Sequence, residues 1–138
     1  MTAKNRILAT LVGFVVLFLL GWLSYGFLLM DFYGTNVGSA SGVMRADDDL
    51  VWWALVFGNV SQAYLLVYIF GKWAKITTFG GGFQGGAMIG LILGLAINLS
   101  MYGTTNMMNL TSALVDPIVS AVIMGVTGGV IAVMLGRK

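Results

Sequence analysis

The sequence predicts an all-α membrane protein, a polytopic bundle of four transmembrane helices with both termini on the cytoplasmic side. The first supporting observation is composition, since 59% of the 138 residues are apolar and only 9% are charged, too few to cover a soluble globule of this size. The second is that the apolar residues form four segments, each long enough to cross a bilayer as a helix. The third is that the basic residues gather at the ends and in one short loop.

The four predicted spans occupy a single domain, residues 1–138. They cover residues 7–30, 50–70, 83–102 and 117–136. Helices are expected because an unpaired backbone group in hydrocarbon costs several kcal/mol, and a helix pairs these groups internally. The first span follows Lys4 and Arg6 as a signal peptide would, but its apolar run exceeds the roughly 7 to 15 residues of a signal-peptide core. We therefore expect this span to be retained.

The positions of the basic residues predict the orientation. Lys and Arg in short loops favour the cytoplasmic side of the membrane. Six of the seven basic residues fall on one side of the predicted spans: Lys4, Arg6, Lys72, Lys75, Arg137 and Lys138. The other side carries Arg45 and all five acids: Asp31, Asp47, Asp48, Asp49 and Asp116. Both termini are therefore expected in the cytoplasm.

Several chemistries lack the residue types that they need. The chain has no cysteine, histidine or glutamate, and these types supply most thiolate nucleophiles, general bases and metal or haem ligands. The nine methionines lack a tight Met-x-Met cluster that would suit copper(I), and gap-filling in an apolar core explains them better. The sequence therefore predicts no enzyme, no metal and no cofactor, and its net charge of +2 is too small to indicate nucleic acid.

Aspartates predict the starts of two helices. Asp47 to Asp49 precede the second span, where carboxylates favour a helix N-terminus. Asp116 followed by Pro117 fits an N-cap and a first helical position. Residues 80–85 spell G-G-G-F-Q-G, but this dinucleotide-binding pattern has meaning only between a strand and a helix. We interpret that glycine run as a flexible hinge.

Small residues repeat every four positions in the last two spans, which places them on one helical face. Close approach at such faces supplies packing between membrane helices. We expect the two spans to form a tight antiparallel pair, although the same faces could form a contact between copies of the chain. The packing residues are Gly86, Gly90 and Gly94 in one span and Ala121, Gly125 and Gly129 in the other.

Polar side chains inside or beside the spans form the best candidate site, because each must find a partner or line a wet cavity. The alternative is that they only hydrogen-bond neighbouring helices, at a modest ~0.6 kcal/mol each. That alternative is favoured for a chain without catalytic residue types. The candidate polar residues are Asn59, Gln62, Asn98, Tyr102, Asn106, Asn109 and Asp116.

A few of these residues carry a resemblance to a family. They are Gly21-Trp22, Tyr25, Tyr102-Gly103-Thr104, Asn109-Leu110 and Val115-Asp116. With them the chain resembles small four-span bacterial membrane proteins classed as a domain of unknown function. The resemblance implies a four-helix inner-membrane fold over nearly the whole chain and no known activity. Thr105, Asn106 and Val119-Ser120 depart from the pattern of the group, which implies a less acidic site in this member.

These observations favour a multi-pass protein of the bacterial inner membrane that acts through contacts. The expected function is that of an accessory or assembly subunit, or of a homo-oligomeric structural protein, with the lipid bilayer as its surroundings. Short loops and glycine packing faces are typical of such proteins. The alternative is a protein that binds or conducts a small solute or ion through amide-lined positions between its helices.

Overall fold

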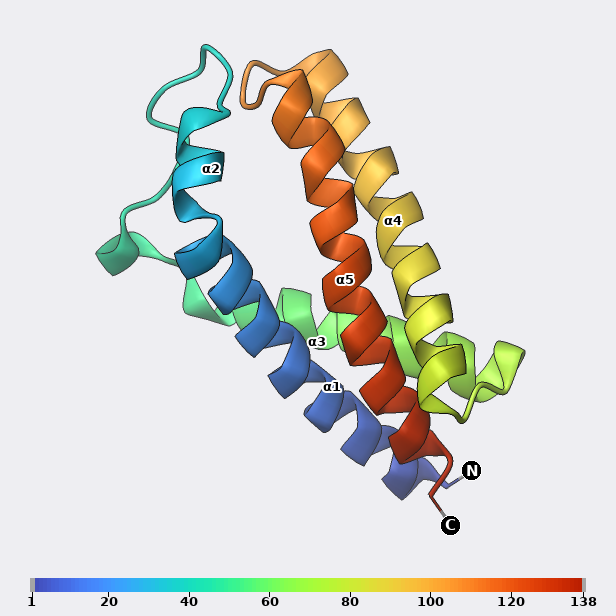
Figure 1. Cartoon of the computed structure of the whole chain (residues 1–138). Coiled ribbons are helices and arrows are strands. Elements are labelled where there is room, and N and C mark those ends of the chain that lie inside the picture. Colours follow the sequence, from blue (N-terminus) through green and yellow to red (C-terminus); the bar gives the residue numbers. More distant parts are fainter. Residues whose placement is uncertain (1, 138) are drawn as a thin grey trace.

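The computed structural model describes residues 2–137, and these residues form helices joined by turns and loops. The predicted all-α class is confirmed. Four helices are long and apolar enough to cross a membrane: Ala3–Leu28, Trp52–Ala74, Phe79–Thr104 and Leu110–Leu135. Figure 1 shows the beginning of the first helix and the end of the last at the same end of the bundle.

Two of these long helices contain a change of helical pitch. The first comprises α1 and then a π-helical turn, η1, and is followed by the short α2; the second comprises α3 and a π-helical turn, η3. In chain order the elements are α1 (Ala3–Leu23), η1 (Ser24–Leu28), α2 (Met30–Thr35), η2 (Asp47–Asp49), α3 (Trp52–Tyr68), η3 (Ile69–Ala74), α4 (Phe79–Thr104) and α5 (Leu110–Leu135).

Helices α4 and α5 lie side by side along their whole length as an antiparallel pair (Figure 1). Glycines permit this approach, because a Cβ added at Gly86 would overlap the carbonyl oxygen of Met124. A Cβ at Gly90 would lie 2.5 Å from the carbonyl oxygen of Ser120, and one at Gly94 would lie 2.7 Å from Cα of Pro117. The backbones therefore touch without intervening side chains.

The face that α5 presents to this contact differs from the predicted stripe. Its closest backbone contacts fall at Pro117, Ser120, Met124 and Gly128, and Gly128 was not among the predicted packing residues. Gly125 and Gly129 lie beside this face, beneath the aromatic rings of Phe83 and Phe79. Ala121 is half-buried.

Helices α1 and α3 cover the other side of α5, and α3 crosses behind α1 and α5 in Figure 1. Their contact is made by side chains, with Leu17, Leu66, Phe70 and Ile131 buried in the core. Gly13 admits Ile131, whose Cδ1 would lie 2.6 Å from an added Cβ. Helix α1 diverges from α5 toward the α2 end of the bundle (Figure 1).

The structure corrects both predicted helix starts. Helix α5 begins at Leu110, so Asp116 and Pro117 lie inside it, and the Asn109 side chain caps it by accepting a hydrogen bond from the Ser112 amide at 2.9 Å. Proline is tolerated there because neighbouring helices can satisfy the backbone groups that it frees. Similarly, Asp47 to Asp49 form the separate turn η2, and no side chain caps α3.

The connection between α2 and α3 (residues 36–51) is attached to the short connection between α4 and α5. Val37 and Met108 form an isolated antiparallel bridge, and the Ala40 amide donates a hydrogen bond of 2.9 Å to the carbonyl oxygen of Asn106. Gly38 makes this contact possible, because a Cβ there would overlap the same carbonyl oxygen. The α2–α3 connection is thereby held over the end of the bundle.

Candidate functional site

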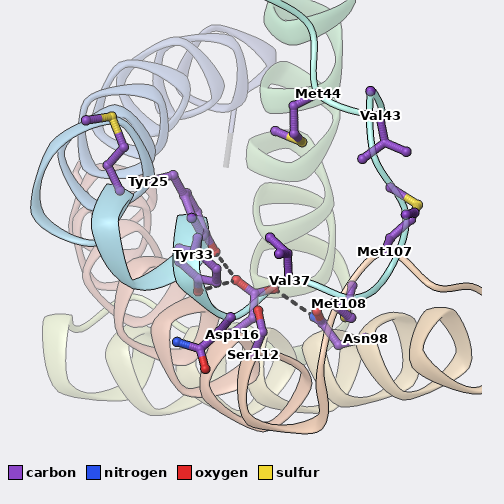
Figure 2. Close-up of a pocket in the computed structure, with 15 residues that line it drawn as sticks. Tyr25, Tyr33, Val37, Val43, Met44, Asn98, Met107, Met108, Ser112 and Asp116 are labelled. Atoms are coloured by element: carbon purple, nitrogen blue, oxygen red, sulfur yellow. Dashed lines mark hydrogen bonds between the residues drawn. The ribbon is translucent and has the colours of Figure 1, made fainter.

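A cavity of about 690 Å³ lies between η1 and α2 on one side and α4 and α5 on the other. The α2–α3 connection and the α4–α5 connection complete its wall, as Figure 2 shows. Most lining side chains are apolar, and four of them are methionines: Met30, Met44, Met107 and Met108. Asp116 contributes the one carboxylate among the lining residues, so we call this space the Asp116 cavity.

The Asp116 carboxylate accepts three hydrogen bonds from side chains. Oδ1 accepts from the Tyr25 hydroxyl at 2.8 Å and from the Tyr33 hydroxyl at 2.7 Å. Oδ2 accepts from Nδ2 of Asn98 at 2.7 Å. Figure 2 shows the tyrosines and Asn98 approaching the carboxylate from opposite sides. Hydrogen bonds to an ionised acceptor are short and roughly twice as strong as neutral ones, so this cluster stabilises negative charge inside an apolar bundle.

No positively charged side chain pairs with Asp116 within residues 2–137, where the recorded salt bridge joins Arg45 and Asp49 at 3.2 Å. The donors around Asp116 are all neutral. A carboxylate in an apolar environment is costly unless it is paired, and ionisable groups in membrane-spanning segments mark functional positions by default. The unpaired charge is therefore the most informative feature of the cavity.

The π-helical turn η1 positions the two tyrosines. On a continuous α-helix, residues 25 and 33 would point about 80° apart, because each residue turns the chain by about 100°. Here the π-helical turn η1 and the non-helical backbone at Leu29 lie between the two residues and change the phase of the helix. The two rings accordingly lie 5.3 Å apart between centroids. Burial, followed by the hydrogen bond to Asp116 and its charge, raises the pKa of Tyr33 well above the usual range, so its hydroxyl stays protonated and donates.

Asn98 continues the glycine stripe of α4, and this position directs its amide toward α5. Its side chain is 7% exposed. Nδ2 donates both to the carbonyl oxygen of Gly94 at 2.9 Å, one turn earlier, and to Asp116. Gly94 lets α5 approach closely at Pro117, the residue after Asp116. The packing stripe therefore places the carboxylate within reach of the amide.

A second polar contact lies beside the cavity. Nδ2 of Asn109 donates to Oδ1 of Asn36 at 3.1 Å, and Oδ1 of Asn109 caps α5. Asn36 lines the cavity, and its own Nδ2 donates to the carbonyl oxygen of Phe32 at 2.9 Å. One asparagine therefore begins α5 and also anchors the end of α2.

Of the seven predicted polar residues, the structure brings Asn98 and Asp116 into direct contact, with Asn109 close by through Asn36. Tyr102 is 42% exposed and does not line the cavity. Asn106 contributes its backbone carbonyl to the Ala40 contact. The predicted set is therefore not one continuous site.

Asn59 and Gln62 line a separate, second cavity of about 520 Å³ between α1, α3 and α5. Nδ2 of Asn59 donates to the carbonyl oxygen of Leu55 in its own helix at 2.8 Å. Tyr25 and Met44 line both cavities and so lie between them. The two groups of amides, predicted together, thus belong to neighbouring spaces separated by a tyrosine and a methionine.

Tyr25 and Tyr33 are the site residues that the polar-residue argument missed. Tyr25 was noted only for its place in the family resemblance. One signal in the sequence pointed to them. An unpaired acid in an apolar helix requires hydrogen-bond donors, and tyrosines near the end of the first span could supply them. Within residues 2–137 no group of three or more His, Cys, Asp or Glu side chains could hold a metal ion.

The site and fold together define a helical protein with membrane-length helices and an apolar cavity that contains one carboxylate. The chain matches no protein-family model, no curated protein and no solved structure. The resemblance to a four-span family of unknown function therefore stays a prediction. Conclusions about function rest on the residues described above.

Proposed function

We propose that this chain is a multi-pass protein of the bacterial cytoplasmic membrane that binds a small solute in the Asp116 cavity. The observation that carries the proposal is a cavity of about 690 Å³, mostly apolar, with a carboxylate that has no cationic partner within the described residues. Ligand pockets typically measure about 300 to 1,000 Å³ and combine apolar walls with a few well-placed polar groups. This role develops the solute-binding alternative drawn from the sequence.

The depth of the site supports this proposal. Asp116 lies six residues into α5, which corresponds to about 9 Å at 1.5 Å per residue. A carboxylate at that depth is expensive to retain for packing alone, since apolar side chains of similar volume would stabilise the helix contact at least as well. Binding requires only the cavity and Asp116, so the proposal assigns no catalytic step.

Mass spectrometry of the protein extracted from its native membrane in mild detergent tests the proposal. We expect the wild type to carry a small molecule that is not a bulk lipid. Val43→Trp, which places a bulky indole on the cavity wall at the α2–α3 connection, should lose it. Val122→Trp adds the same side chain at a residue that is 56% exposed on α5, and should keep it. A bare wild-type protein, or the same bound mass on Val43→Trp, contradicts the proposal.

A second candidate function is assembly into a homo-oligomer or a larger membrane complex. The specific observation is that Gln62, which lines the second cavity, is also exposed in the middle of α3. In hydrocarbon an exposed amide lacks water, and polar side chains commonly hydrogen-bond a neighbouring helix. Gln62→Leu should reduce the oligomer fraction in native mass spectra if α3 forms the contact, whereas an unchanged spectrum removes this support.

A further inference from the structure

We infer that the ligand of the Asp116 cavity is a lipophilic organic monocation, a hydrophobic amine with its ammonium group at Asp116 and its apolar body among the methionines. The inference rests on the proposed function and specifies its ligand class. Four features of the structure support it: the state of the carboxylate, the chemistry of the wall, the aromatic rings beside the charge, and the distribution of acids along the chain.

The carboxylate retains room for one more donor. An ionised carboxylate has about four lone-pair positions, two on each oxygen. Tyr25 and Tyr33 occupy both positions on Oδ1, and Asn98 occupies one on Oδ2. One position on Oδ2 therefore remains for the N–H group of an ammonium ion. An ammonium there would also supply the positive charge that the described residues do not.

The wall suits a large apolar body of variable shape. Val37, Ala40, Val43 and the four methionines make up most of the apolar lining. Methionine is unbranched, flexible and polarisable, so surfaces rich in methionine adapt to different apolar ligands. The volume of about 690 Å³ exceeds what a bare ion needs and matches an organic molecule.

Two aromatic rings lie beside the carboxylate. Tyr25 and Tyr33 both line the cavity, and their hydroxyls meet at Oδ1 of Asp116. A ligand cation within about 6 Å of an aromatic centroid gains roughly 0.5 to 2 kcal/mol from the ring quadrupole. A ligand cation that also reaches the face of either ring gains this further attraction, which does not depend on N–H groups.

The distribution of acids favours entry of cations. All five carboxylates belong to α2, the α2–α3 connection or the first turns of α5, the segments that also form the cavity: Asp31, Asp47, Asp48, Asp49 and Asp116. The one base in these segments, Arg45, already pairs with Asp49. A cleft with one sign of charge raises the local concentration of ions of opposite sign.

Other ligand classes fit less well. Calcium takes six to eight oxygen ligands and magnesium demands octahedral geometry, whereas here the tyrosine hydroxyls and the amide already point at Asp116. Anions would meet an unpaired negative charge. Sugars need many hydrogen-bonding partners, and this wall is mostly apolar.

The test compares 4-phenylbutylamine with its neutral counterpart 4-phenylbutanol, in binding to the full chain in lipid nanodiscs at pH 7. Empty nanodiscs correct for partition into lipid. We expect the wild type to bind the amine at least tenfold more tightly than the alcohol. Asp116→Asn should reduce this preference to less than twofold. Asp31→Asn removes a carboxylate that does not line the cavity, so it should keep a preference of at least fivefold. Equal wild-type affinities for amine and alcohol overturn the inference without reference to any variant.

Two further measurements keep the test decisive if Asp116→Asn does not fold. Val43→Trp should lose binding of both probes, which places the amine in the cavity, and unchanged amine binding to it overturns the inference. The mass spectra of the extracted protein separate the two proposals. If the wild type carries a native solute but shows no preference for the amine, the proposed ligand class is wrong and the binding function stands. If it carries no native solute and binds neither probe, both proposals are wrong.

Discussion

At the scale of residues, Asp116 connects parts of the chain that are far apart in sequence. Its partners Tyr25 and Tyr33 lie 91 and 83 positions earlier, and Asn98 lies 18 positions earlier. The carboxylate thereby joins η1, α2, α4 and α5 through three hydrogen bonds. Removing one donor should weaken this connection without creating an apolar void.

Tyr33→Phe tests that connection. The change deletes the hydroxyl and leaves the ring, so the free energy of unfolding should fall by about 1.5 to 3 kcal/mol, the usual contribution of a hydrogen bond to a charged group. Reversible unfolding in mixed detergent micelles measures the loss. Tyr102→Phe is the control, because its exposed ring lies away from the cavity, and it should change the stability by less than about 0.5 kcal/mol. An equal loss in both variants would contradict a specific role for Tyr33.

Sequence reasoning found half of the cluster for a physical reason. Asn98 and Asp116 stand out because a polar group in an apolar helix must find a partner. Tyr25 and Tyr33 do not stand out, since tyrosine is also common at the membrane interface, where it needs no specific partner. Their convergence further depends on the π-helical turn, which changes the phase of the helix and leaves no pattern in the spacing of apolar residues.

At the scale of elements, the α4–α5 pair depends on the absence of side chains between backbones. Gly86→Ala would push a methyl group into the carbonyl of Met124, so we expect destabilisation of about 1 to 3 kcal/mol. Gly58→Ala in α3 is the control, because an added Cβ meets nothing within 4 Å there. It should be neutral or stabilising by about 0.5 to 1 kcal/mol, the usual gain of alanine over glycine in a helix. Reversible unfolding in mixed detergent micelles distinguishes the expected loss of stability in Gly86→Ala from the neutral or stabilising effect of Gly58→Ala.

The attachment of the α2–α3 connection gives a second prediction at this scale. Gly38→Ala should detach the connection from Asn106 and free the backbone around the exposed Arg45 to enter the active site of trypsin. We therefore expect at least tenfold faster cleavage after that residue in nanodiscs. Gly34→Ala, where an added Cβ meets nothing within 4 Å, should leave the cleavage rate unchanged. Mass spectrometry of the fragments reports the site. Similar rates for both variants would show that the contact does not hold the connection.

The starts of the elements were harder to predict than their existence. The order Asp116-Pro117 is typical of a helix start, yet Asn109 begins α5 and the proline lies within the helix. Packing explains this outcome, because α4 presents Gly94 to Pro117 and the helix pair stays continuous past the proline. The packing face of α4 was predictable because its glycines repeat every four positions and therefore lie on one side of the helix. On α5 the contact face includes Met124, which is not small, so a search for small residues every four positions selected the neighbouring stripe instead.

At the scale of the whole molecule, composition was sufficient to predict four membrane-length helices, while the arrangement of the helices was not predictable. The segments follow from hydropathy and from the need to pair backbone groups. Which helices touch depends on contacts between segments far apart in sequence, such as Gly13 with Ile131. The cavity results from that arrangement, since α1 and α2 diverge from α5 at one end of the bundle (Figure 1).

The absence of cysteine makes the orientation predicted from the basic residues easy to test. Ser39→Cys lies in the α2–α3 connection and Thr77→Cys lies between η3 and α4, both at exposed positions. With both termini in the cytoplasm, a membrane-impermeant maleimide should label Ser39→Cys in intact spheroplasts and Thr77→Cys only after lysis. The cysteine-free wild type provides the background. The reverse labelling order would place the Asp116 cavity on the cytoplasmic side.

The separation of 91 residues between Tyr25 and Asp116 also has a consequence in time. Chains grow at about 5 to 20 residues per second, so roughly 5 to 18 s pass between synthesis of the tyrosine and synthesis of its acceptor. During that interval the first helix has been synthesised, but the final partner of its Tyr25 hydroxyl has not. A chain that stops before α5 never gains that partner. Its Tyr25 hydroxyl therefore lacks the hydrogen bond to Asp116, and this distinguishes a nascent or truncated product from the finished protein.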